Sequence, residues 1–230
     1  MELSIDTSTR YAAVGLSRQG ETGAEFAWRS ERNHSVELVP AIRRLLDHAG
    51  VEIEELTAVF LAVGPGGFSA LRVGMSTAVS LATARDIPLV AVGTLEIEAL
   101  SHLGVGHQVN AIVGAGKTRL YIGVFPGGGP VTAGETMLIE HDAFLDTLTP
   151  EAIYCGEAVQ TMSASIRERL GDAARIANVA PPTRHASAVA RLGFERLQAG
   201  DVADATTLEP IYLRSSQVSS AARRWGQSRR

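Results

Sequence analysis

The sequence predicts a duplicated α/β protein, because one order of strands and helices occurs twice along its 230 residues. Three short β-prone segments precede helix and strand patterns in the first half, and a similar series restarts near Val109. Hydrophobic residues make up 45% of the chain, which is ample for a packed core. We therefore expect an N-terminal lobe over 1–103, a C-terminal lobe over 104–214, and a tail over 215–230.

The first lobe begins with an antiparallel meander of three strands joined by short polar turns. A helical stripe of apolar residues then ends at Gly50, a residue type that commonly terminates helices. In chain order, we expect strands at 2–6, 11–17 and 23–28, a helix at 35–49, a strand at 57–63, a helix at 69–84, a strand at 88–92 and a short helix at 94–102.

The second lobe repeats this order less clearly. Two β-prone segments surround a glycine-rich turn, and a loop rich in glycine and proline follows them. We expect strands at 110–113, 120–125 and 131–139, a helix at about 140–147, a strand at 152–155, and helices at 157–170 and 184–199.

The segment from Gly64 to Gly74 is a glycine-rich turn between a buried strand and a helix. Such a turn lets the backbone approach another backbone or a ligand closely. It is typical of a phosphate cradle, because free N–H groups and the helix dipole favour an anion there. A tight strand-to-helix connection explains the glycines equally well, and no Lys follows the turn as a P-loop requires.

The helix after this turn carries a row of small side chains at every fourth position, bordered by an apolar ridge. A second helix can approach such a row unusually closely. Spacing alone leaves open whether that partner belongs to this chain or to another. The row is Ala70, Gly74, Ala78 and Ala82, and the ridge is Leu71, Met75 and Val79.

Polar side chains at the end of the first strand form a candidate ligand site. A carboxylate and hydroxyls in the sequence Asp6-Thr7-Ser8-Thr9 would suit a phosphate or a water-bound magnesium ion. The same residue types routinely satisfy backbone groups of a turn, so both interpretations stand. The matching position of the second half is Gly114, where no carboxylate is present.

The sequence Gly114-Ala115-Gly116-Lys117-Thr118 resembles the end of a Walker A loop. A true Walker A loop needs a glycine at position 111, which is Ala111, and a helix directly after the Lys. A β-prone segment follows instead. We therefore expect a turn between strands.

Other classes of site have little support in the sequence. The six histidines show no pair at i, i+4 and no His-Glu-x-x-His string, so we expect no metal site. No Gly-x-Ser-x-Gly elbow is present, so we expect no catalytic set in this chain. Cys155 is the only cysteine and excludes an internal disulfide.

Charge and hydropathy bound the location and the partners. The net charge of −4 argues against a surface that binds nucleic acid throughout. No secretory signal and no apolar run of about 20 residues is visible, so we expect a cytoplasmic protein. The tail carries Trp225 among four arginines, which would suit RNA contacts, although a polar, frayed tail fits its composition better; these arginines are Arg223, Arg224, Arg229 and Arg230.

Five segments of this chain together resemble the bacterial TsaB (YeaZ) family. The match covers the first 100 residues well and the second half thinly, and the Gly-Pro-Gly string in its context is the most specific part. The segments are Asp6 to Thr9, His34 to Pro40, Gly64 to Gly74, Gly93 to Glu96, and Glu209 to Arg214.

The resemblance implies an actin/Hsp70-like fold of two ribonuclease-H-like lobes. It also implies a noncatalytic partner of the transferase TsaD in forming threonylcarbamoyladenosine beside the anticodon of tRNA, with ATP and metal on TsaD and on the ATPase TsaE. Members commonly have Asp-Ala-Arg where this chain has Gly114-Ala115-Gly116, which argues further against independent nucleotide chemistry. Rival hypotheses are an ATP-dependent small-molecule kinase of the same fold and a peptidase-like hydrolase.

By the same resemblance, the helices at 35–49 and 69–84 would pair with TsaD or with a second copy of this chain. Gly74→Leu or Ala78→Leu would then abolish the complex while the isolated fold survives. The residues expected at this interface are Ser35, Leu38, Val39, Ile42, Leu46, Ala70, Leu71, Gly74, Met75, Ala78, Val79 and Ala82.

Overall fold

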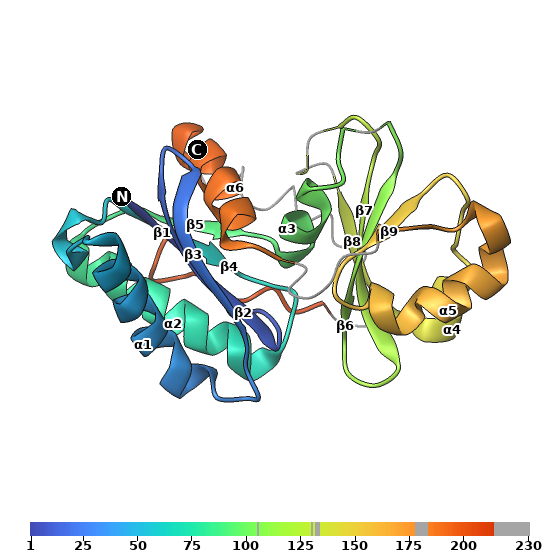
Figure 1. Cartoon of the computed structure of the whole chain (residues 1–230), viewed down its shortest axis with the longest axis horizontal. Helices are drawn as coiled ribbons and strands as arrows, with labels where there is room; N and C mark the ends of the chain where they lie inside the picture. The colour runs from blue at the N-terminus through green and yellow to red at the C-terminus, as the bar shows by residue number, and fades with distance from the viewer. Residues whose placement is uncertain (105, 130, 132–133, 178–183, 214–230) are drawn as a thin grey trace. The chain divides into compact units, whose positions relative to one another are not determined.

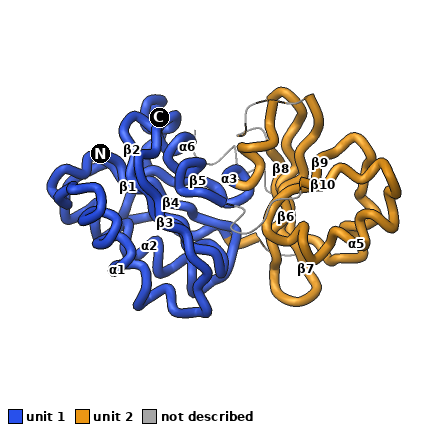
Figure 2. Tube along the Cα trace, viewed as in Figure 1, with its two compact units in different colours: residues 1–97, 184–211 blue, residues 98–183, 212–230 orange. Residues whose placement is uncertain are grey.

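The structure is a computed structural model that describes residues 1–104, 106–129, 131, 134–177 and 184–213. The chain divides into two compact units, each built on one five-stranded sheet (Figures 1 and 2). The first unit comprises residues 1–97 and 184–211, and the second comprises residues 98–183 and 212–230.

The sheet of the first unit has the strand order β3-β2-β1-β4-β5. Strands β1, β2 and β3 are antiparallel, whereas β4 and β5 continue the sheet in parallel with β1. The elements are β1 (Glu2–Asp6), β2 (Tyr11–Arg18), β3 (Glu21–Arg29), α1 (His34–Ala49), η1 (Ile53–Glu55), β4 (Ala58–Ala62), α2 (Phe68–Arg85), β5 (Leu89–Val92) and α6 (Ala186–Gln198), and α3 (Thr94–Leu100) spans the boundary with the second unit.

Helices cover both faces of this sheet. The alternate residues Val59 and Leu61 of β4 belong to one core with α1 and α2. Phe60, between them, faces the opposite side, where a Cβ at Gly193 of α6 would lie 2.3 Å from its ring. The first strand is buried along its whole length, so its polar end is held inside the unit.

The second unit repeats the same topology. Its sheet has the order β10-β9-β6-β7-β8, with β6, β7 and β8 antiparallel and β9 and β10 in parallel with β6. Its core includes Ile112, Phe144, Tyr154 and Ile166. The elements are β6 (Val109–Gly114), β7 (Arg119–Phe125), β8 (Glu135–Glu140), α4 (His141–Leu145), β9 (Ile153–Cys155), α5 (Val159–Leu170), η3 (Gly171–Ala173) and β10 (Arg175–Ile176).

The repeated strand order confirms the predicted duplication of an α/β unit. The contiguous lobes 1–103 and 104–214 differ from the observed units, because α6 packs on the first sheet although it follows the second. The third strand of the second unit begins at Glu135 rather than at residue 131. The tail over 215–230 lies outside the described residues.

Candidate functional site

The polar turn after β1 is closed by an arginine from the far end of the chain. Arg184 directs its Nε to Asp6 Oδ2 at 2.7 Å, and the two side chains are 1% and 2% exposed. The same guanidinium donates to Thr9 Oγ1 at 2.7 Å and to the carbonyl of Tyr11 at 3.1 Å. A cation of the protein itself therefore occupies the position where the predicted ligand would meet Asp6.

Local hydrogen bonds use the remaining groups of this turn. The backbone N–H of Ser8 donates to Asp6 Oδ1 at 2.8 Å, and the Ser8 hydroxyl donates to the same oxygen. The ring Nε2 of His34, at the start of α1, lies 2.8 Å from the carbonyl oxygen of Thr9. Three of the four predicted ligand residues, Asp6, Ser8 and Thr9, therefore bond within the turn or to Arg184, whereas the Thr7 hydroxyl points to α2.

The glycine-rich turn fits against this polar turn. A Cβ at Gly66 would lie 2.0 Å from the carbonyl oxygen of Ser8, so only glycine leaves room for that backbone. The N–H of Gly67 donates to the same oxygen at 2.7 Å. Close backbone approach therefore explains the glycines here, as in the interpretation of the turn as a tight strand-to-helix connection.

The small-residue row of α2 has its partner within the same chain. A Cβ at Gly74 would lie 2.3 Å from Thr7 Oγ1, and that hydroxyl donates to the carbonyl of Ala70 at 2.8 Å. Ala78 and Ala82 are also buried. Ala70 and Gly74 therefore let α2 approach the end of β1, and the burial of Gly74, Ala78 and Ala82 corrects the expectation that these three meet another chain.

Most of the other expected interface residues also face the core. They are apolar residues of the two helices that pack on the sheet, so their burial in the folded chain keeps them from a partner. This correction applies to Leu38, Ile42, Leu46, Leu71 and Met75. The helices form as predicted, but the regular apolar stripe marks their inner faces.

The outer surface of α1 and α2 carries a different set of apolar residues. Val36 is 68% exposed, Val39 is 59% exposed and Phe68 is 55% exposed. The guanidinium carbon of Arg72 lies 4.0 Å from the centre of the Phe68 ring. We call these three residues, with exposed Ser35 and half-buried Ala70 and Val79, the pairing surface.

Sequence reasoning missed Val36 and Phe68. The available signal was an apolar residue outside the inward stripe of an amphipathic helix, since Val36 precedes the buried Leu38 by two positions and therefore lies on another side of α1.

Residues Gly114 to Thr118 form a turn between β6 and β7, as predicted. The N–H of Ala115 donates to the carbonyl of Arg119 at 2.9 Å, and β7 follows directly. Gly116 has a φ of +88°. A Cβ at Gly114 would meet no described atom within 4 Å, so no described residue covers the strand end that corresponds to Asp6.

The remaining titratable groups bear on a possible metal site and on the lone thiol. Among the described residues, no three His, Cys, Asp or Glu side chains lie where they could hold a metal ion. Burial raises the pKa of the Cys155 thiol well above its usual value, and the charge of Glu98 acts in the same direction. None of the helices that the structure describes is both long and apolar enough to span a membrane.

Comparisons with known proteins agree with this geometry. A family model described as TsaD, tRNA N6-adenosine threonylcarbamoyltransferase, matches residues 28–219. The tRNA threonylcarbamoyladenosine biosynthesis protein TsaB of Bacillus subtilis is 28% identical over 233 residues, which cover 99% of each chain.

Two solved structures support the fold. A Pseudomonas aeruginosa protein, described as uncharacterized with similarity to peptidase YEAZ, matches with a TM-score of 0.77 and 24% identity over 93% of this chain and 99% of that one. The activator of the 2-hydroxyisocaproyl-CoA dehydratase from Clostridium difficile, a structure with bound ADPNP, has a TM-score of 0.53 and 8% identity over 91% of this chain and 98% of that one.

The duplicated sheet topology and these neighbours define an α/β protein of the actin/Hsp70-like fold class. In this chain the polar turn after β1 is occupied by Arg184. The chain belongs to the TsaB (YeaZ) family.

Proposed function

We propose that this chain is the noncatalytic partner subunit of a complex that forms threonylcarbamoyladenosine in tRNA, beside the anticodon. In that complex it pairs with a TsaD-type transferase and activates it. The curated relative that matches over the full chain is named for this pathway, and the TsaD family model matches most of the sequence.

The closed turn after β1 carries the noncatalytic part of the proposal. A nucleotide-binding site needs accessible donors and a carboxylate that can reach a ligand or its metal. Here Asp6 is 1% exposed, and its oxygens accept from Ser8 and Arg184. No observation in the described part of the chain favours the independent kinase or the peptidase-like hydrolase.

The remaining components follow from this assignment. We propose that the chain binds no cofactor tightly on its own, and that ATP and metal belong to the TsaD-type transferase and a TsaE-type ATPase. It would meet tRNA through the complex and work in the cytoplasm. A homodimer through the pairing surface would be a resting form that exchanges for the transferase.

The pairing surface supplies the physical basis for assembly. Large apolar side chains that gather at the surface mark interaction sites, and here α1, which carries two of them, packs beside α2, which carries the third. Val36 and Val39 on α1 and Phe68 on α2 are more than half exposed and lie at the N-terminal ends of their helices. Burying a side chain of this kind contributes roughly 1.5–3 kcal/mol, so a few of them can hold a specific interface.

The test is calorimetric titration of the purified TsaD-type partner with surface variants. Val39→Arg and Phe68→Arg should abolish measurable binding, because each buries an unpaired charge, while thermal stability stays within about 1 kcal/mol of the parent. Val202→Arg is the matched control, since Val202 is 46% exposed and lies outside α1 and α2. Equal binding by both pairing-surface variants and the control would refute this surface.

A further inference from the structure

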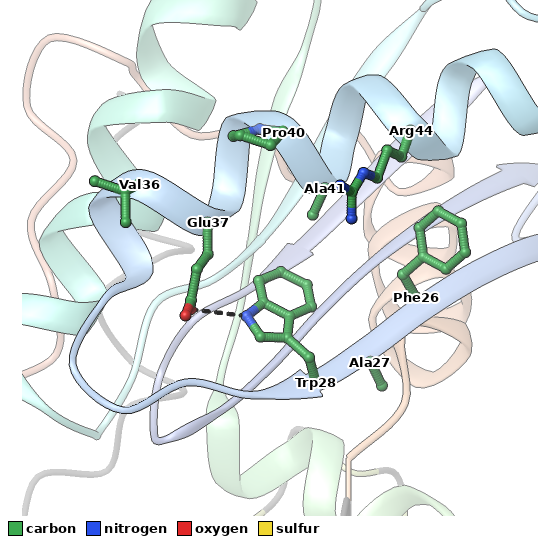
Figure 3. A pocket seen from close by; sticks show the side chains of 8 residues that line it. All are labelled: Phe26, Ala27, Trp28, Val36, Glu37, Pro40, Ala41 and Arg44. Atoms are coloured by element: carbon green, nitrogen blue, oxygen red, sulfur yellow. Dashed lines mark hydrogen bonds between the residues drawn. The ribbon is translucent and has the colours of Figure 1, made fainter.

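An apolar groove lies between β3 and α1 in the first unit, and Val36 of the pairing surface lines one end of it (Figure 3). Its volume is about 530 Å³, within the range of roughly 300–1,000 Å³ for binding pockets. Phe26 and Trp28 of β3 form one wall, and Pro40 and Ala41 of α1 form the other. The groove is therefore an apolar trough bounded by one strand and one helix.

The strand that borders the groove is an edge strand with backbone groups directed outward. Among the described strands, β3 pairs with β2 alone. The N–H of Ser30 donates to the carbonyl of Arg10 at 2.7 Å, and Trp28 pairs with Ala12 in the same register. Bonded pairs alternate in an antiparallel ladder, so Ala27 and Arg29 direct their N–H and C=O groups away from β2.

The two residues that carry these outward groups lie at the surface. Ala27 and Arg29 are exposed, and no described backbone group pairs with either beyond the β2 ladder. An edge strand of this kind is a template for a further strand.

Trp28 is held in a fixed position at the groove. Its indole Nε1 donates to Glu37 Oε2 at 3.0 Å, from β3 to α1 (Figure 3). Hydrogen bonds from Ser30 and Trp28 lower the pKa of Glu37, so this carboxylate is charged and already committed. The Trp28 ring is therefore held in place with an apolar face toward the groove, and the Glu37 carboxylate already accepts hydrogen bonds from the protein.

Arg44 is the charged side chain of the groove that can bind a ligand. It makes no hydrogen bond or ion pair with any other described residue, and Figure 3 shows it extending from α1 over Phe26 and Trp28. A guanidinium carries five donors in a planar fork that matches a carboxylate. The groove thus pairs an apolar wall with one unsatisfied cation.

We propose that this groove binds an extended acidic peptide segment of another protein by strand addition to β3. The backbone of that segment would hydrogen-bond to Ala27 and Arg29. One apolar side chain would pack against Trp28, and a carboxylate two residues away on the same face would pair with Arg44, because side chains alternate along a strand.

The groove and the pairing surface share Val36 and otherwise lie on different flanks of α1. Glu37, Ala41 and Arg44 follow helical spacing on the flank that faces β3. Ser35 and Val39 lie on another side of the helix by the same spacing. This peptide site is therefore additional to the proposed complex with the transferase, and it is tested at Ala27 and Arg44, which lie outside the pairing surface.

The probe is a pair of N-acetylated, C-amidated peptides, Thr-Val-Thr-Leu-Thr-Glu-Thr-Val-Thr and its sequence reversal, which cover both strand directions. Binding is followed in the full chain by nuclear magnetic resonance of the Ala27 and Arg29 amides, and by Trp28 fluorescence after Trp225→Phe removes the other of the two tryptophans. At least one peptide should shift these signals, and replacing its Glu by Lys should weaken binding about tenfold.

Two variants test the two parts of the proposal. Arg44→Glu should reverse the preference between the Glu and Lys peptides, whereas Arg43→Glu, beside it on the exposed face of α1, should leave the preference unchanged. Ala27→Pro removes an outward N–H without breaking the β2 ladder, so it should weaken either peptide about tenfold and spare folding.

Three outcomes would overturn the proposal. The first is the absence of any shift at about millimolar peptide, and the second is equal binding of the Glu and Lys peptides. The third is a peptide-free dimer that Ala27→Pro dissolves, which would identify a second copy of this chain as the occupant of the edge.

Discussion

The buried pair of Arg184 and Asp6 gives the sharpest prediction of this structure. Arg184→Met keeps much of the side-chain volume but removes the charge and the bonds to Asp6, Thr9 and Tyr11. It leaves the Asp6 carboxylate 1% exposed without its cation. Breaking a buried pair in this way costs about 3–5 kcal/mol, because one charge remains uncompensated.

This cost should be visible in thermal and urea unfolding of the isolated chain. For a protein of this size, 1 kcal/mol corresponds to about 2–4 °C, so we expect the melting temperature to fall by about 6–20 °C. Hydrogen exchange at β1 amides assigns the loss to the first unit.

A matched control separates the buried pair from charge removal in general. Arg191→Met removes an exposed pair to Glu195 at 3.3 Å, whose side chains are 67% and 59% exposed, and should cost less than about 1 kcal/mol. The double variant Asp6→Asn with Arg184→Met should recover part of the loss, since no net charge is then buried. A loss for Arg184→Met as small as that for Arg191→Met would refute this account of the turn.

The remaining predictions concern α2 and the lone thiol. Gly74→Ala places a Cβ 2.3 Å from Thr7 Oγ1 and should cost about 1–3 kcal/mol in urea unfolding; a double-mutant cycle with Thr7→Ala should show coupling, and simple additivity would contradict this packing. Ala78→Leu should destabilise the isolated fold far more than Ser80→Leu on the exposed side, and equal melting temperatures would contradict the inward orientation. Because burial raises the pKa of Cys155, Ellman's reagent should react slowly at pH 8 until denaturant is added, and immediate reaction would contradict its burial.

The sequence predicts the elements well because local signals govern them. Apolar periodicity marks α1 and α2 within one or two residues, and the repeat of short strands indicates the duplicated topology. The return of α6 to the first sheet has no local signal. It depends on shape at distant positions, such as Gly15, where a Cβ would lie 2.6 Å from Ala186.

In the candidate site, too, the local residues are visible in the sequence, whereas the contacts between distant positions are not. The acidic and hydroxyl residues of Asp6 to Thr9 are visible as a polar cluster, but their partner lies 178 positions from Asp6 along the chain. Spacing also cannot tell which side of a two-sided helix meets its own sheet. The row of Ala70 to Ala82 indicates close approach correctly, and only the structure shows that β1, rather than another helix, makes that approach at Gly74.

The proposed role is tested most directly by reconstituting threonylcarbamoyl transfer to tRNA from a purified TsaD-type transferase and a TsaE-type ATPase, with and without this chain. We expect transfer only when this chain is present, its loss with Phe68→Arg, and no nucleotide turnover by the chain alone. Transfer that proceeds equally without the chain, or ATP turnover by the chain alone, would contradict the assignment as a noncatalytic partner.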